Sequence, residues 1–194
     1  NQNSSLIKLD KESGSTIFIQ TNDNGGVDAY EQAAKIPEGI VAVGYVHSED
    51  PWNTFFTWGQ GYLVFFDDNG NIQSSQGLNE YMAQGYRVQY ANESIFISGL
   101  SEDASDFILV KMDLEGNVIW DQSYGGNSDD HCFGMDVNPD GEIFLAGHTL
   151  SGTENWDTYT IKVDFNGDLL WERIIGNPRG FDPEYIHDEA WGVR

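Results

Sequence analysis

A short pattern occurs four times along this chain, each time at the end of an apolar run. Each copy ends in an aspartate, and a glycine follows three or four residues later. The aspartates, Asp10, Asp67, Asp113 and Asp164, are 57, 46 and 51 residues apart. Self-similarity at a period of roughly 20–50 residues indicates an array of similar units that pack side by side. The pattern therefore predicts a repeat architecture and excludes most others.

The best-formed repeat predicts four short antiparallel strands separated by polar turns. They are expected over 131–137, 142–147, 157–164 and 168–175, where β-branched and aromatic residues are bounded by Gly, Asn and Asp. The preceding repeats predict further strands over 28–36, 40–44, 61–67, 71–75, 94–99, 106–113 and 117–124. Residues 5–10 and 15–21 give only a third and a fourth strand, and 189–194 only a first strand.

Four-stranded antiparallel units of this length are the blades of a β-propeller. We expect an all-β fold, a segment of about four four-stranded blades that belongs to a longer propeller. The expected boundaries are a half blade over 1–26, whole blades over 27–78, 79–127 and 128–182, and the first strand of the next blade over 183–194.

Glycines and aromatic residues also recur in register. Gly44, Gly99 and Gly147 lie near the ends of second strands, where we expect neighbouring blades to approach closely. Trp120 and Trp171, with Phe18 roughly equivalent, are expected to pack between blades rather than to hold a cofactor.

The charge of the chain limits its partners. With 32 acidic and nine basic residues, the formal net charge is −23, which disfavours nucleic acid and anionic membrane surfaces as partners. A single cysteine, Cys132, excludes an internal disulfide, and no apolar run approaches the ~20 residues of a membrane span. Because the chain begins at Asn1 and shows no signal peptide, we expect a mature, trimmed or excised segment.

The third full repeat carries a recognisable series of motifs. It reads Tyr-Gly-Gly-Asn-Ser-Asp-Asp over 124–130, Asp-Gly over 140–141, Ala-Gly-His-Thr over 146–149 and Lys-Val-Asp over 162–164, followed by Gly167 and Trp171. This series resembles the repeats of large secreted β-propeller proteins of Bacteroidetes that carry a C-terminal sorting domain. The resemblance is strong over 94–176 and moderate over 28–77, where Ser74 replaces the tryptophan and Phe65 the lysine. It implies an extracellular location and a binding or scaffolding role.

Basic residues recur in the predicted first strands, which line the channel of a propeller. Alignment on Gly85, Gly134 and Gly192 places Arg87, Asp136 and Arg194 in register, and Lys35 joins them if Ala33 matches the glycines. A ring of cations around the channel would suit an anionic ligand such as a uronate or a sulfated sugar. The alternative is that these cations only neutralise nearby acids such as Asp136.

Other residues support a catalytic alternative. His131 or His187, with a tyrosine such as Tyr81, could act as base and acid in β-elimination on a uronate sugar, and Arg87 would neutralise the carboxylate. A propeller polysaccharide lyase that acts on acidic glycans is therefore the competing function. One cysteine and four scattered histidines show no zinc-ligand spacing.

Two further clusters are candidates for ligand contacts. Acidic residues precede the first strands, and Asp129, Asp130, Asp188 and Glu189 are candidates for calcium binding, since Ca²⁺ takes six to eight oxygen ligands. The aromatic insertion that contains Trp52 and Trp58 could stack on sugar rings or plug the edge of a blade. The function expected overall is a secreted, non-catalytic module that binds carbohydrate or another extracellular ligand, with the remaining blades of the propeller as further partners.

Overall fold

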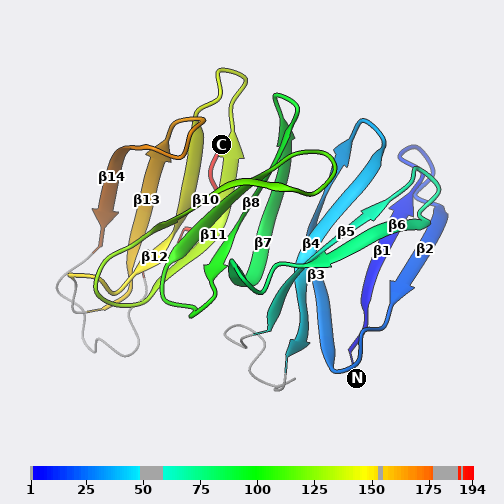
Figure 1. Ribbon diagram of the computed structural model, residues 1–194, viewed down its shortest axis with the longest axis horizontal. Coiled ribbons are helices and arrows are strands. Elements are labelled where there is room, and N and C mark those ends of the chain that lie inside the picture. The colour runs from blue at the N-terminus through cyan, green and yellow to red at the C-terminus, as the bar shows by residue number, and fades with distance from the viewer. Residues whose placement is uncertain (1, 49–58, 153–154, 177–187, 189) are drawn as a thin grey trace.

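The structure is a computed structural model that describes residues 2–48, 59–152, 155–176, 188 and 190–194. The described part is all-β, with fourteen strands and no helix, so it holds no helix that could cross a membrane. Figure 1 shows the sheets following one another across the molecule, from β1 and β2 at one end to β14 at the other.

The strands form one two-stranded sheet and three four-stranded sheets, each with its strands in chain order and antiparallel. The two-stranded sheet is β1 (Ser4–Leu9) and β2 (Thr16–Asn22). The second sheet is β3 (Val27–Ile36), β4 (Gly39–Ser48), β5 (Gln60–Phe66) and β6 (Ile72–Gly77). The third is β7 (Met82–Ala91), β8 (Ser94–Ser101), β9 (Phe107–Met112) and β10 (Val118–Tyr124). The fourth is β11 (Asp130–Val137), β12 (Ile143–Thr149), β13 (Asp157–Val163) and β14 (Leu169–Ile175).

These sheets confirm the repeated four-strand unit and the half unit at the start. The segment 28–36, whose composition is also compatible with a helix, is strand β3. The opening strand expected over 189–194 is wrong for the described residues 188 and 190–194, which form no strand. A strand needs a hydrogen-bonded neighbour, and no described second strand pairs with this segment.

The repeated aspartate closes the turn between the third and fourth strands of each sheet. In the last sheet, the backbone N–H groups of Asn166 and Asp168 both donate to Asp164 Oδ1. The N–H of Gly167 donates to the Asp164 carbonyl, and Gly167 has a φ of +88°, which a residue with a side chain rarely adopts. These turns are hydrogen-bonded hairpin turns, as the pattern of residues predicted.

Each first strand contains one extra residue at the same place. The pairing registers of β3, β7 and β11 with their second strands shift between Tyr30 and Gln32, Gly85 and Arg87, and Cys132 and Gly134. The bulged residues are Glu31, Tyr86 and Phe133. Because a bulge adds an unpaired residue and re-aims a side chain, it changes which residues of the strand are equivalent.

The repeated glycines meet the bulged strands and not the neighbouring sheet. A Cβ added to Gly99 would overlap the carbonyl oxygen of Gln84, which lies in β7 of the same sheet. Gly44 and Gly147 stand in the same relation to Ala29 and His131. The expected close approach of neighbouring blades at these glycines is therefore wrong: the contact lies within each sheet, where the bulged first strand comes against the second strand.

Two apolar cores fill the spaces between the four-stranded sheets. One joins the second and third sheets and includes Val41, Leu63, Ile97 and Val110. The other joins the third and fourth sheets and includes Phe96, Leu109, Leu145 and Ile161. The sheets thus pack face to face through alternate side chains, as half-buried strands do.

The three first strands lie next to one another and are linked by glutamine side chains. Gln32 Oε1 accepts a hydrogen bond of 2.8 Å from the Val88 N–H, and Gln89 Oε1 accepts one of 2.7 Å from the Val137 N–H. In each bond a glutamine of one first strand accepts from a backbone N–H of the next first strand, and the two strands are thereby held together.

Candidate functional site

A pocket of about 440 Å³ opens where the first strands meet. Its walls include the bulged residue of every four-stranded sheet, Glu31, Tyr86 and Phe133. Trp191, from the segment after the last sheet, completes the wall. The pocket is therefore built from one repeated position, which the bulges turn toward a shared space.

Backbone contacts show that Trp191 occupies the corresponding place in a fourth unit. The Asp130 N–H donates to the Ser105 carbonyl, and the Asp188 N–H donates to the Trp156 carbonyl in the following sheet. Three residues after Asp130 comes Phe133, and three after Asp188 comes Trp191. Residues 188 and 190–194 thus follow the path of a first strand without being paired as one.

Aromatic rings form one side of the pocket. Phe133 and Trp191 are stacked, with 4.4 Å between ring centroids and an interplanar angle of 19°. Tyr86 meets Phe133 edge to face at 5.2 Å. Phe133 and Tyr86 are buried, whereas Trp191 is 49% exposed and offers its ring to the apolar face of a ligand ring.

Polar groups form the other side. Gln84 is almost fully buried, and its Nε2 donates to Glu31 Oε1 at 3.2 Å. Gln84 Oε1 is also buried and has no hydrogen-bond partner among the described residues. A buried acceptor without a donor carries a desolvation cost, which the Nε2 bond to Glu31 offsets in part.

Arg87 is held at the rim by two backbone carbonyls. Its Nη1 donates to the Tyr86 carbonyl at 3.0 Å and its Nη2 to the Trp191 carbonyl at 3.3 Å. The guanidinium therefore joins the third sheet to the 188–194 segment. Because a guanidinium has five N–H donors, donors remain for a ligand.

Burial changes the acidity of the groups in the pocket. The pocket walls raise the pKa of Glu31, although the Gln84 hydrogen bond and the charge of Arg87 act in the opposite direction. Burial also raises the pKa of Tyr45 and Tyr86, and the Glu31 charge adds to both shifts. Both tyrosines therefore keep their hydroxyl protons at neutral pH and can act as hydrogen-bond donors.

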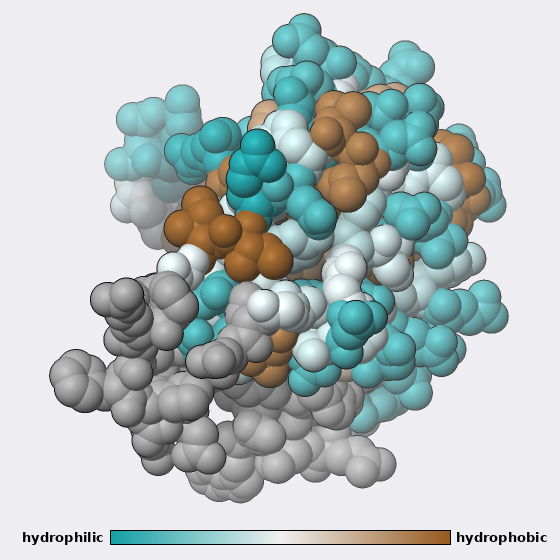
Figure 2. Space-filling model, turned by 90° about the vertical axis from the view of Figure 1, so that its left-hand side faces the viewer, coloured by the Kyte–Doolittle hydropathy of each residue, from teal (hydrophilic) through white to brown (hydrophobic). Residues whose placement is uncertain are grey.

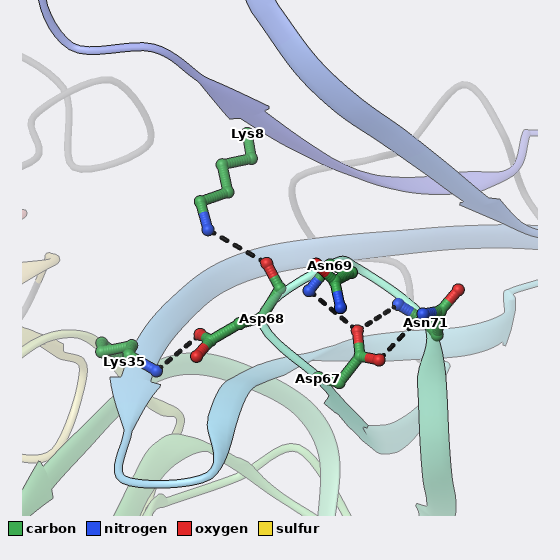
Figure 3. Close-up of polar contacts among 6 residues, drawn as sticks. All are labelled: Lys8, Lys35, Asp67, Asp68, Asn69 and Asn71. Atoms are coloured by element: carbon green, nitrogen blue, oxygen red, sulfur yellow. Dashed lines mark hydrogen bonds and ion pairs between the residues drawn. The ribbon is translucent and has the colours of Figure 1, made fainter.

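The proposed ring of cations is only partly assembled. Arg87 and Arg194 line a second cavity of about 220 Å³ together with Asp136, next to the main pocket. Lys35 lies elsewhere, at the end of β3, where its Nζ pairs with Asp68 Oδ1 at 2.7 Å (Figure 3). The bulges explain the difference: Lys35, Tyr90 and Val137 share one register position, opposite Ile40, Ile95 and Ile143.

The alignment on Gly85, Gly134 and Gly192 also placed Arg87 at the wrong position of the first strand. Gly44, Gly99 and Gly147 pair with Tyr30, Gly85 and Cys132, so Gly85 is equivalent to Cys132 and not to Gly134. Arg87 then corresponds to Gly134, two residues before Asp136. A ligand-binding role for Lys35, Arg87 and Arg194 remains a prediction.

The described residues proposed for a lyase lie in three different places. His131 is buried in β11, and its Nδ1 lies 3.1 Å from Nε2 of the buried His148. Burial lowers the pKa of His131 to about 4. Tyr81 lines a different, acidic cavity with Glu80 and Asp106, whereas Arg87 lines the main pocket.

The acids that precede the first strands have structural contacts. Asp130 Oδ2 accepts hydrogen bonds from the Gly126 N–H and the Ser151 hydroxyl, at 2.7 and 3.0 Å. The equivalent Asp28 accepts bonds from the N–H groups of Asn24 and His47. Asp129 is exposed, and within the described residues no three His, Cys, Asp or Glu side chains are grouped to hold a metal ion. Trp52, Trp58, His187 and Glu189 lie outside the described residues.

Sequence reasoning missed most of the pocket. Glu31, Tyr86, Phe133 and Trp191 differ in type, so no motif marks them as equivalent. Their shared feature is their distance from the buried acids: Glu31, Phe133 and Trp191 each lie three residues after Asp28, Asp130 and Asp188. That spacing is visible in the sequence, and an alignment on these acids would have found the position.

A scan against protein-family models and a search of curated proteins returned no match.

Proposed function

We propose that this chain is a segment of a β-propeller that binds an extracellular carbohydrate in the pocket between its first strands. The propeller is supported by three consecutive four-stranded antiparallel sheets whose first strands lie side by side. In such an arrangement the first strands surround the axis, where ligands commonly bind.

The observation that carries the binding proposal is the convergence of one repeated position on one pocket. Four successive units contribute Glu31, Tyr86, Phe133 and Trp191 to its walls. The volume of about 440 Å³ lies within the ~300–1,000 Å³ typical of small-molecule sites.

A sugar fits the chemistry of these walls better than a purely apolar ligand does. The exposed Trp191 ring, held by stacking on the buried Phe133, offers a flat surface to the carbon–hydrogen face of a pyranose. Glu31 and the tyrosine hydroxyls offer hydrogen-bond partners to ring hydroxyl groups. Arg87 lies between this pocket and the cavity that it shares with Arg194, which would accommodate an acidic substituent.

Glycan-array screening followed by isothermal titration calorimetry tests this function. Trp191→Ala should weaken binding of the best glycan by at least about tenfold, from the loss of a ring contact, and Gln84→Met by about tenfold, from the loss of the hydrogen bond that holds Glu31. Trp171→Ala, which removes a partly exposed tryptophan from another face, is the matched control and should leave the affinity unchanged. Equal affinity in all three variants would exclude this pocket as the binding site.

The competing lyase function is tested with the same glycans. An increase in the absorbance of unsaturated uronates on incubation with acidic oligosaccharides would favour it. Binding without such an increase would favour the non-catalytic module.

A further inference from the structure

The turn after each third strand docks on the sheet before it. The turn residue, which follows the repeated aspartate, is Asp68, Leu114 or Phe165 in the three four-stranded sheets. The glycines of these turns have φ values of +87°, +88° and +88°, and each glycine N–H donates to the aspartate carbonyl. Each turn therefore presents its turn residue in the same way.

The contacts are most complete at Phe165, which docks on the third sheet. Its ring lies 3.4 Å from Lys111 Nζ and meets Phe96 edge to face at 5.3 Å. Lys111 Nζ also donates to the Phe165 carbonyl. The ring of Trp120 covers Gly167, since a Cβ built there would lie 3.2 Å from it. A phenylalanine, a lysine and a tryptophan thus form a socket for the turn.

The same lysine and aromatic positions act at the first sheet. Lys8 Nζ donates to the Asp68 carbonyl at 3.0 Å, as Figure 3 shows, and the Phe18 ring lies against Gly70. Lys8 pairs with Phe18 across the strands, just as Lys111 pairs with Trp120.

The second sheet has no lysine at this position, and the turn that docks on it has a different turn residue. Phe65 stands in the lysine position, and the turn residue that packs on the same core is Leu114. Gln76 Nε2 donates to the Gly116 carbonyl at 2.9 Å. At this sheet an apolar socket residue and an apolar turn residue therefore occur together.

The last sheet carries a fourth socket with the geometry of an occupied one. Phe144 and Trp171 have ring centroids 6.3 Å apart at 59°, against 6.3 Å and 58° for Phe96 and Trp120. Lys162 Nζ lies 5.4 Å from the Phe144 ring, against 5.7 Å for Lys111 and Phe96. The side chains are thus preorganised for a turn.

This socket lies on the outer face of the molecule. Trp171 is 37% exposed, and Lys162 Nζ pairs with Glu142 Oε1 at 2.6 Å rather than with a turn carbonyl. Figure 2 looks onto this end and shows apolar side chains exposed among hydrophilic ones. The exposed apolar residues of β14 are Leu169, Leu170, Trp171, Ile174 and Ile175.

We propose that Phe144, Lys162 and Trp171 bind the turn of a further four-stranded sheet, supplied by the same polypeptide through the 188–194 segment. This segment already follows the path of a first strand against β11, with Gly192 next to Gly134 and Trp191 on Phe133. The turn should read Asp-Phe-Asn-Gly or Asp-Asp-Asn-Gly, as the turns on the two other lysine sockets do, because a lysine attracts both an aromatic face and a carboxylate.

A second copy of the chain fits this face less well. The turn that its first sheet would offer, residues 10–14, is one residue longer and has Lys11 as its turn residue. Lys11 would meet Lys162, and two chains of formal charge −23 repel each other. A further sheet in the same polypeptide need not have the longer turn with Lys11, and its docking does not require two separate chains to associate.

The test extends the full chain at residue 194 with a copy of residues 137–176, which continues the register after Arg194. Oxidative footprinting read by mass spectrometry measures labelling at Trp171, with the copied Trp171 replaced by phenylalanine so that the two peptides differ in mass. Trp171 should be labelled several-fold more slowly than in the parent chain. Replacing the copied Phe165 with alanine should restore labelling, whereas replacing the copied Leu170, which is exposed in the parent, should not.

Labelling of Trp171 that stays at the parent rate overturns the proposal, whether or not the added residues fold. Protection that survives replacement of the copied Phe165 overturns the role of the turn. Sedimentation of the parent chain is the third arm: self-association that protects Trp171 would assign the face to a second copy. Glycan binding is measured in parallel, so failure of this proposal is distinguishable from failure of the proposed function.

Discussion

Lys111 of the third sheet lies with its Nζ 3.4 Å from the centroid of the Phe165 ring, which belongs to the turn of the fourth sheet. Lys111 is 8% exposed, and burial lowers its pKa. A buried ammonium group is stable only with partners, and here the aromatic face and the Phe165 carbonyl supply them. One side-chain pair thus satisfies a buried charge and joins two repeats.

Removing this ring should loosen the joint between the sheets. Phe165→Ala is expected to lower the free energy of unfolding by about 2 kcal/mol, below the 3–5 of a fully buried ring because Phe165 is half-buried. Urea denaturation monitored by circular dichroism measures the change. Ile119→Ala, at a side chain that is 54% exposed, is the control and should change stability by less than about 0.5 kcal/mol. Equal losses of stability in the two variants would contradict the claim that Phe165 joins the third and fourth sheets.

A methyl group on a repeated glycine should be far more damaging than its size suggests. In Gly99→Ala the new Cβ would overlap the Gln84 carbonyl, and backbone on both strands would have to move. We expect a loss of about 3 kcal/mol or more, or no folded protein. Gly192→Ala has open space around the added atom and should be nearly neutral. Thermal unfolding of the two variants, run side by side, decides between these outcomes.

Asp28 should matter as a loop cap. It is fully buried and accepts backbone hydrogen bonds from Asn24 and from His47, whose φ of 59° is unusual for a residue with a side chain. Asp28→Ala leaves two N–H groups without an acceptor and should cost about 2 kcal/mol. Asp28→Asn keeps one acceptor oxygen and should cost about half as much. If the two variants unfold at the same urea concentration, the cap does not act through these bonds.

Glu31 should make stability depend on pH. Its pKa is raised in the folded chain, so the folded state keeps the proton to a higher pH than the unfolded state does. Above the unfolded value of about 4.3, the folded state therefore binds more protons, and stability falls as pH rises through the window up to the folded pKa. Glu31→Gln should flatten this fall in urea titrations at several pH values from about 4 upward.

Removing any negative charge from so acidic a chain changes stability, so this experiment needs a matched variant. Glu12→Gln removes one charge from an exposed turn residue outside the pocket. The slope against pH should differ between the two variants. A Glu12 variant with the same flattened slope would assign the effect to net charge.

The strands were predictable from sequence because their signal is local. β-Branched and aromatic runs bounded by Gly, Asn and Asp gave β8, β9, β13 and β14 within one or two residues. The turns were equally plain, since Asp164 and Gly167 have the chemistry that the hairpin needs.

The sequence did not predict which residues of the three first strands occupy equivalent positions. A bulge inserts one residue without any required residue type, as Glu31, Tyr86 and Phe133 show. Gly85 and Gly134 look equivalent in sequence yet lie on opposite sides of a bulge, and the proposed position of Arg87 moved by two residues as a result. The pocket depends on these long-range relations, which explains why it was missed.

The bulged position gives the fold an economical way to change specificity. The residue at the bulge takes no part in strand pairing, so no partner strand fixes its identity, although Tyr86 and Phe133 also pack with Ala83 and Leu100. Related arrays could acquire new preferences by substituting a single side chain per repeat, much as antibodies vary their loops on a constant framework.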